Sequence, residues 1–313
     1  MVNPEESPQP AQPERLVIID MSGPDAGPHT MKVPPAGDAS VAQWAKGALD
    51  PYTWSEEGLR VKSLVPEGYE AYVRLFYKPW YLGHETEVRS EELGEELHSL
   101  LEAYRAAGST EWPPQDPEFR AKLKEQDELH SLEPTLRTWR AIAESNGKVA
   151  HPNMEWHQIA SRKVDDEELI GYGPELDFEE LALIVETLRP FTPPSEPCVF
   201  LVWEGYGVEE LQSNKAPRID IGHPHLIFEG TLDSALGFVW NGWEQPPNMW
   251  WPQNRAWCVA SEIDLDTAVI GGSRELIEAF LEHPQLECLP VSADDPIHGH
   301  ADFVNGGESS QPE

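Results

Sequence analysis

The stretch Pro247–Asp264, PNMWWPQNRAWCVASEID, decides how the rest of the chain is arranged, and it holds three of the twelve tryptophans. A turn rich in Pro and Asn leads directly into the apolar run Trp257–Ile263, which has the length and composition of a β-strand. A second apolar run, Thr267–Ile270, follows after a short polar break. This part of the chain therefore predicts two strands that are consecutive in sequence.

Further strands are predicted on both sides of this stretch. Continuous apolar composition, as in Tyr69–Tyr77 and Cys198–Trp203, is expected for strands that are buried on both faces. Shorter apolar runs at Leu16–Asp20 and Leu226–Phe228 also predict strands, and Cys288–Val291 predicts an edge strand because Pro290 lacks a backbone donor.

Two helices with buried stripes complete the pattern. Asp177 and Glu180 have the spacing of a capping box, and the stripe of the following helix is Leu181, Ile184, Val185 and Leu188. The turn Gly271-Gly272-Ser273 opens a second helix, whose inward side chains are Leu276, Ile277, Phe280 and Leu281. We therefore predict an α+β fold: a mixed, mostly antiparallel sheet that carries packed helices.

An acidic helical region interrupts this pattern. Between Glu85 and Glu133 there are fourteen acidic and five basic side chains, and Leu93, Leu97, Leu100 and Leu101 recur at helical spacing. We predict a disordered tail over residues 1–14, a single α+β domain over 15–291 with a helical insert at about 85–147, and a flexible tail over 292–313.

The composition excludes several classes of protein. Fifty-six acidic and 22 basic side chains give a formal net charge of -34, which excludes a nucleic-acid binder that works by phosphate neutralisation and disfavours an anionic bilayer surface. No apolar run approaches the ~20 residues of a membrane helix, and residues 1–14 do not form a signal peptide. The three cysteines lie far apart in apolar runs, which favours a soluble protein in the reducing cytoplasm.

Three segments carry a resemblance. They are Ser63–Arg74, His151–Ile159 and Asn248–Asp264 with the following Gly271-Gly272-Ser273. Together they resemble a family of actinobacterial proteins to which no activity is assigned. The resemblance implies one integrated domain and implies no function, and it does not extend to the acidic insert.

The aromatic side chains around Pro247–Asp264 suggest a binding site. Neighbouring residues of an extended chain face opposite ways, so Trp250 and Trp251 cannot both point inward. We therefore expect a groove lined by at least one of Trp243, Trp250 and Trp251, with Asn248 and Arg255 as the nearby polar groups.

Histidine and glutamate side chains give a second set of candidates. His223 and His225 are two residues apart, so a strand would place both imidazoles on one face, and Glu155 or Glu204 could complete a metal shell. The alternative is a polar loop that enters a strand. No HExxH or comparable motif is present, and we predict no metal and no cofactor. The candidate catalytic residues are His157, His225, Glu204 and Glu262.

These observations lead to two functional hypotheses. The first is a non-enzymatic cytoplasmic binding protein, such as an inhibitor or immunity protein, whose aromatic cleft and acidic surface meet a basic protein partner. The alternative is a hydrolase or nucleotide-processing enzyme that uses the His and Glu side chains around the same cleft.

Overall fold

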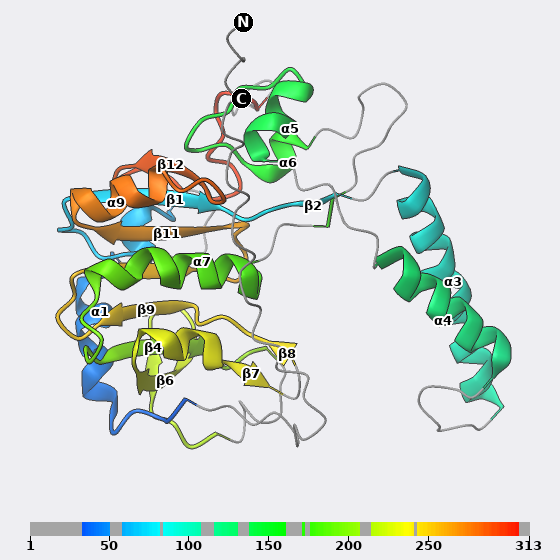
Figure 1. Ribbon diagram of the computed structural model, residues 1–313, viewed down its shortest axis with the longest axis horizontal. Helices are drawn as coiled ribbons and strands as arrows, with labels where there is room; N and C mark the ends of the chain where they lie inside the picture. Colours follow the sequence, from blue (N-terminus) through cyan, green and yellow to red (C-terminus); the bar gives the residue numbers. More distant parts are fainter. Residues whose placement is uncertain are drawn as a thin grey trace, which may run out of the picture.

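The computed structural model describes residues 33–50, 58–81, 84–107, 116–130, 138–160, 171–172, 176–206, 214–240 and 243–306. The tail expected over residues 1–14 and the strand expected at Leu16–Asp20 lie outside these ranges. An eight-stranded antiparallel sheet with packed helices dominates the described residues (Figure 1), which confirms the predicted α+β class.

The sheet is built from segments that are far apart in sequence. From one edge to the other its strands are β12 (Glu287–Val291), β1 (Ala71–Phe76), β11 (Thr267–Gly272), β10 (Cys258–Ser261), β9 (Met249–Pro252), β4 (Cys198–Trp203), β6 (Pro224–Gly230) and β5 (Arg218–Asp220). All neighbouring strands are antiparallel. The stretch Pro247–Asp264 supplies β9 and β10 at the centre of the sheet, and the predicted edge strand is β12.

Helices cover both faces of the sheet. On one face lie α7 (Phe178–Leu188), α9 (Arg274–Leu281) and the 3-10 helix η3 (Leu232–Gly237), whose apolar side chains share a core with Phe200 and Trp250. On the other face, η1 (Ala39–Ala42), α1 (Gln43–Ala48) and α2 (Val61–Leu64) share a second core with Leu201 and Trp251. The central strands are therefore buried on both sides.

The helix starts follow the sequence signals with one exception. Asp177 accepts a hydrogen bond from Glu180 N at 2.6 Å, as a helix cap should, but the Glu180 carboxylate does not return to the cap. It accepts from Lys78 N instead, at 3.2 Å. At α9, Ser273 caps Leu276 N at 3.2 Å, and the expected inward side of this helix is correct except for Leu281, which is 38% exposed.

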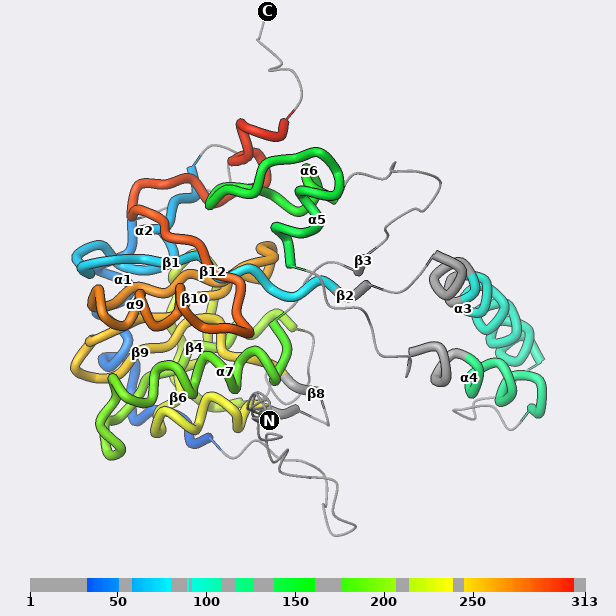
Figure 2. Tube along the Cα trace, turned by 45° about the horizontal axis from the view of Figure 1, so that its top comes forward, coloured from blue at the N-terminus to red at the C-terminus, as the bar shows by residue number. Residues whose placement is uncertain are grey.

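The acidic insert contains an arm of two helices. Helix α3 (His84–Ala106) and helix α4 (Pro117–His130) pack against each other and extend away from the sheet (Figures 1 and 2). Ion pairs join the two helices, including Arg89–Glu125 at 2.8 Å and Lys122–Glu96 at 2.6 Å. The third helix, α5 (Trp139–Ser145), packs on the body through the buried Trp139.

Smaller elements complete the described fold. They are α6 (Trp156–Ile159), η2 (Arg189–Phe191) and the two-stranded pairs β2 (Trp80–Tyr81) with β3 (Gly171–Tyr172) and β7 (Val239–Trp240) with β8 (Trp243–Glu244).

The segment after β12 packs on the body of the protein. Residues 292–306, which the sequence placed in a flexible tail, bury Ile297 and Asp302. The Asp302 carboxylate accepts hydrogen bonds from Glu155 N and Asn305 N and contacts His151 Nε2 at 2.8 Å. Spacing alone gave no sign of this polar cluster. Residues 307–313 lie outside the described residues.

Candidate functional site

The expected tryptophan groove is wrong for two of its members. Trp250 is 0% exposed and Trp251 is 1% exposed. They do face opposite ways, as neighbours in a strand must, but each meets a separate helix-covered core because β9 lies in the middle of the sheet. The inference failed because it assumed that one face of the sheet was open. The side chain of Trp243 lies outside the described residues.

Four of the other candidates lie at one end of the sheet. Asn248 precedes β9, Glu204 follows β4 and Glu262 follows β10, while His225 is the second residue of β6. These strands run in alternating directions, so the end of one lies beside the start of the next. By contrast, the exposed His157 lies in α6, and Arg255 lies at the opposite end of the sheet, between β9 and β10.

Asn248 holds this end of the sheet together. Its Oδ1 accepts from Trp203 N at 2.8 Å, and its Nδ2 donates to the Tyr206 hydroxyl at 2.8 Å. Its backbone carbonyl accepts from Ser261 N. Asn248 is itself buried, with 6% exposure. Its amide therefore positions Trp203 and Tyr206 rather than contacting a ligand directly.

A recess opens beside Trp203. Its lining residues are Trp203, Glu204, Gly205, Arg218, His223 and Pro224, and its volume is about 560 Å³. The Trp203 ring lies 5.0 Å from the Tyr206 ring and 5.9 Å from the His223 ring, measured between centroids. The chain turns over the indole so closely that a Cβ atom at position 205 would lie 2.1 Å from the ring. A side chain at position 205 would therefore force the indole to move.

Charged groups surround the recess. Arg218 Nε donates to Glu204 Oε2 at 2.6 Å on the rim. Behind the His223 ring, Glu262 Oε1 lies 3.7 Å from His223 Nε2, and the Glu262 side chain is only 8% exposed. Burial raises the pKa of Glu262 to about 7, although the backbone N–H of Asp264 opposes this by donating to the carboxylate. Glu262 therefore titrates near neutral pH.

His225 has a different role from the one expected. It is buried, and burial lowers its pKa to about 4, which keeps the ring neutral. Its Nδ1 lies 2.7 Å from the His223 carbonyl oxygen. His225 thus fixes the backbone that carries His223, and His223 is the histidine that faces the recess. The described residues contain no group of three or more His, Cys, Asp or Glu side chains that could hold a metal ion.

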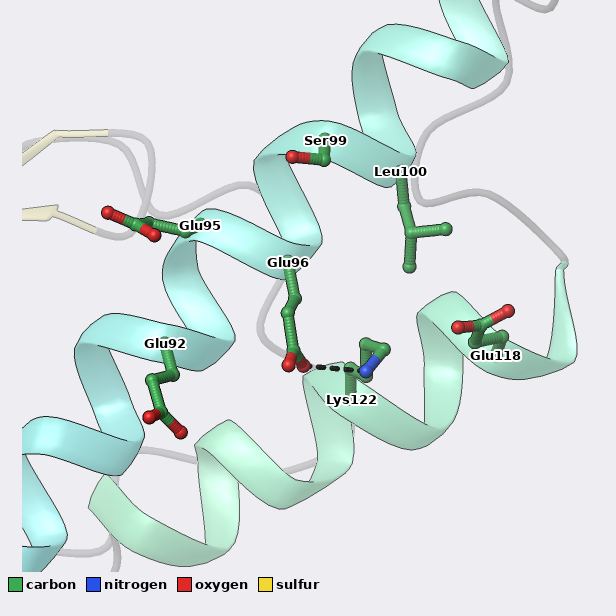
Figure 3. Close-up of a pocket in the computed structure, with 7 residues that line it drawn as sticks. All are labelled: Glu92, Glu95, Glu96, Ser99, Leu100, Glu118 and Lys122. Carbon is green, nitrogen blue, oxygen red and sulfur yellow. Dashed lines mark hydrogen bonds and ion pairs between the residues drawn. The ribbon is translucent and has the colours of Figure 1, made fainter.

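A second concave surface lies on the arm. A groove of about 680 Å³ between α3 and α4 is lined by Glu92, Glu95, Glu96, Ser99, Leu100, Glu118 and Lys122 (Figure 3). Lys122 pairs with Glu96 at 2.6 Å and Arg89 pairs with Glu92 at 3.3 Å, so Glu95 and Glu118 are the two lining carboxylates with no ion pair among the described residues. This groove is open and acidic, whereas the Trp203 recess combines ring faces with both signs of charge.

Sequence reasoning did not single out the recess. Trp203 was predicted within a buried strand, and His223 was weighed as a metal ligand with His225 or as part of a polar loop. The available signal was the position of aromatic and charged residues at the ends of predicted strands, at 203–206, 223–225 and 262–264. The missing information was the strand order, which brings these three points together.

Comparison with known proteins identifies no relative: no family model, curated protein or solved structure matches this chain. The resemblance to the actinobacterial family stays a prediction. Among the described helices, none is long and apolar enough to span a membrane.

Proposed function

We propose that this chain is a cytoplasmic binding protein whose Trp203 recess receives a cationic side chain, Arg or Lys, from a basic protein partner. The observation that supports the recess as the site is the indole of Trp203 beside the carboxylate of Glu204. A guanidinium or ammonium group is stabilised by the face of an indole and by a nearby carboxylate.

The protein already contains the ionic part of this contact. Arg218 places its guanidinium against Glu204 within the lining of the recess. The Glu204 side chain is 29% exposed and that of Arg218 is 41% exposed, so a partner can reach both. A partner arginine would share Glu204 with Arg218 or displace it, and the Trp203 ring would cover the incoming group.

The charge of the chain supports a basic partner. A formal net charge of -34 attracts a basic protein over long distances and raises its rate of association. The acidic groove of the arm adds carboxylates at a distance from the recess (Figure 3). The free thiols of Cys198, Cys258 and Cys288 support a location in the reducing cytoplasm.

A peptide titration tests the proposal. An arginine-rich fluorescent peptide is titrated by anisotropy, with the same peptide carrying citrulline in place of arginine as the neutral control. We expect Trp203→Leu to weaken binding about tenfold, since a desolvated cation–π contact contributes about 1–2 kcal/mol. Glu118→Gln on the arm should change how steeply the peptide affinity falls with salt, and should leave the peptide affinity at high salt unaltered. Equal binding by Trp203→Leu and the parent protein would refute the recess as the site.

One observation favours a second candidate, a hydrolase or nucleotide-processing enzyme. Glu262, with its pKa of about 7, stands within 3.7 Å of His223 beside an open recess, which suits general acid–base chemistry. His157 and His225 do not take part in this arrangement. If the protein is an enzyme, Glu262→Gln should abolish turnover of a chromogenic ester or phosphoester without lowering the melting temperature. Under the binding proposal, the same variant retains peptide affinity, and neither protein turns over substrate.

A further inference from the structure

The turn that carries Arg255 has an unusual backbone. Among the described residues, Arg255 is the only residue other than glycine with a positive φ, at 58°. Hydrogen bonds fix the turn on both sides: Arg255 N donates to Pro252 O at 2.7 Å, and Ala256 N donates to Asn254 Oδ1 at 2.9 Å. Glycine would adopt this conformation without strain, so the arginine side chain is kept here at a cost to the fold.

The side chain of Arg255 lies on an aromatic platform. Its guanidinium carbon is 4.9 Å from the centroid of the Trp44 ring. Trp44 in turn contacts the buried Trp251 edge to face, with centroids 5.4 Å apart. The platform is therefore anchored in the core, and the guanidinium on it is held in a defined place.

Arg255 has no carboxylate partner among the described residues. Lys62, Arg89 and Arg218 each form an ion pair with an acidic side chain. No ion pair and no side-chain hydrogen bond of Arg255 is found within the described part of the chain. The Arg255 guanidinium is therefore exposed on its aromatic platform and available to an anion from outside the protein.

A second polar group lies near this guanidinium. The hydroxyl of Tyr69 is buried and has no hydrogen-bond partner among the described residues. Arg255 is close enough for its charge to act on the phenol, where burial raises the pKa and the guanidinium opposes that shift. The Tyr69 ring packs on Gly271, where a Cβ atom would lie 2.7 Å from the ring.

We propose that Trp44, Tyr69 and Arg255 form a recognition site for a small oxyanion, either a carboxylate or a phosphate group. A guanidinium stacked on an indole presents its N–H donors at its edge, in the geometry that binds two oxygens of one anion. The phenol of Tyr69 supplies a further donor. The site lies at the opposite end of β9 from the Trp203 recess, so it does not depend on the cation-binding role proposed for that recess.

The test is an NMR titration of the Trp44 indole N–H signal, assigned from its loss in Trp44→Phe. Inorganic phosphate and sodium acetate are the two probes, and sodium chloride at the same ionic strength is the reference. We expect a saturable shift with a dissociation constant on the order of 1 mM. A stronger response to phosphate assigns the site to phosphate groups, and an equal or stronger response to acetate assigns it to carboxylates.

Variants separate recognition from folding. Arg255→Gly suits the backbone of this turn and should abolish the shift, while Arg255→Lys keeps the charge and should weaken binding about tenfold, because an ammonium group lacks the planar fork. Tyr69→Phe should weaken it less. Arg140→Lys, an exposed substitution on α5, is the matched control and should bind as the parent protein does. The proposal is overturned if the parent shows no saturable shift, or if Arg255→Gly keeps it.

Discussion

The buried guanidinium of Arg74 is the sharpest place to test how this fold is held together. Arg74 is 1% exposed, and its side chain donates to Thr267 Oγ1, Glu155 Oε1 and the carbonyl oxygens of Pro152 and Met154, at 3.0–3.2 Å. It thereby ties β1 and β11 to the loop before α6. Arg74→Met keeps most of the volume and removes all four contacts.

The expected cost follows from what the substitution leaves behind. Glu155 is 6% exposed, and burial already raises its pKa to about 7 even with Arg74 beside it. Without Arg74, a buried carboxylate loses its counter-charge, which costs about 3–5 kcal/mol of unfolding free energy. Since the folded pKa of Glu155 lies above its unfolded value, folded protein retains a proton that unfolded protein releases. The penalty of Arg74→Met should therefore be smaller near pH 5 than near pH 8.

Urea unfolding followed by far-ultraviolet circular dichroism measures this penalty. Glu155→Leu is combined with Arg74→Met in a double-mutant cycle. We expect a coupling of about 2–3 kcal/mol, because the double variant has no unpaired charge but still leaves the Pro152 and Met154 carbonyl oxygens without donors. A loss below about 1 kcal/mol for Arg74→Met, or strictly additive effects, would refute the reasoning.

Three further predictions concern the core and pH dependence. Burial raises the pKa of Glu180 to about 8, so the free energy of unfolding should fall as pH rises from about 4.5 to 8. Glu180→Gln should reduce this fall by a few kcal/mol in urea titrations at several pH values, and an unchanged pH dependence would contradict the prediction. Gly271→Ala should cost about 1–3 kcal/mol in the same assay through overlap with Tyr69, whereas Gly94→Ala, where a Cβ meets open space, should not destabilise. Trp251→Ala should cost about 3–5 kcal/mol in calorimetry, and a loss near zero would contradict its burial.

The sequence predicted the central strands because they are short, continuous apolar runs, and such runs fit few structures other than a strand buried on both faces. Cys198–Trp203 is β4 with the predicted bounds, and Thr267–Ile270 lies within β11. Helix α7 was predicted because its capping residue and its stripe of apolar side chains are both local features of the sequence. Local pattern and long-range structure agree in these elements.

The site was less accessible because it depends on strand order. Trp203 ends β4, His223 precedes β6 and Glu262 follows β10, and no local rule states which strands are neighbours. Missing long-range information also explains the error over Trp250 and Trp251. The alternation of side chains along a strand placed them correctly on opposite faces of the sheet, but no local pattern showed that helices cover both faces. Arg255 was selected for its charge, and its backbone conformation could not be read from composition.

Strand β1 has a consequence for how the protein is made. It lies between β11 and β12, with Tyr72 opposite both Gly271 and Val291, so its two partners are the last of the described strands in chain order. During synthesis this apolar strand must wait, with both edges unpaired by β11 and β12, while nearly 200 further residues are made. A premature stop anywhere before Thr267 would release a product in which β1 has no neighbour, and such a product should be degraded or aggregate rather than persist as a shorter folded form.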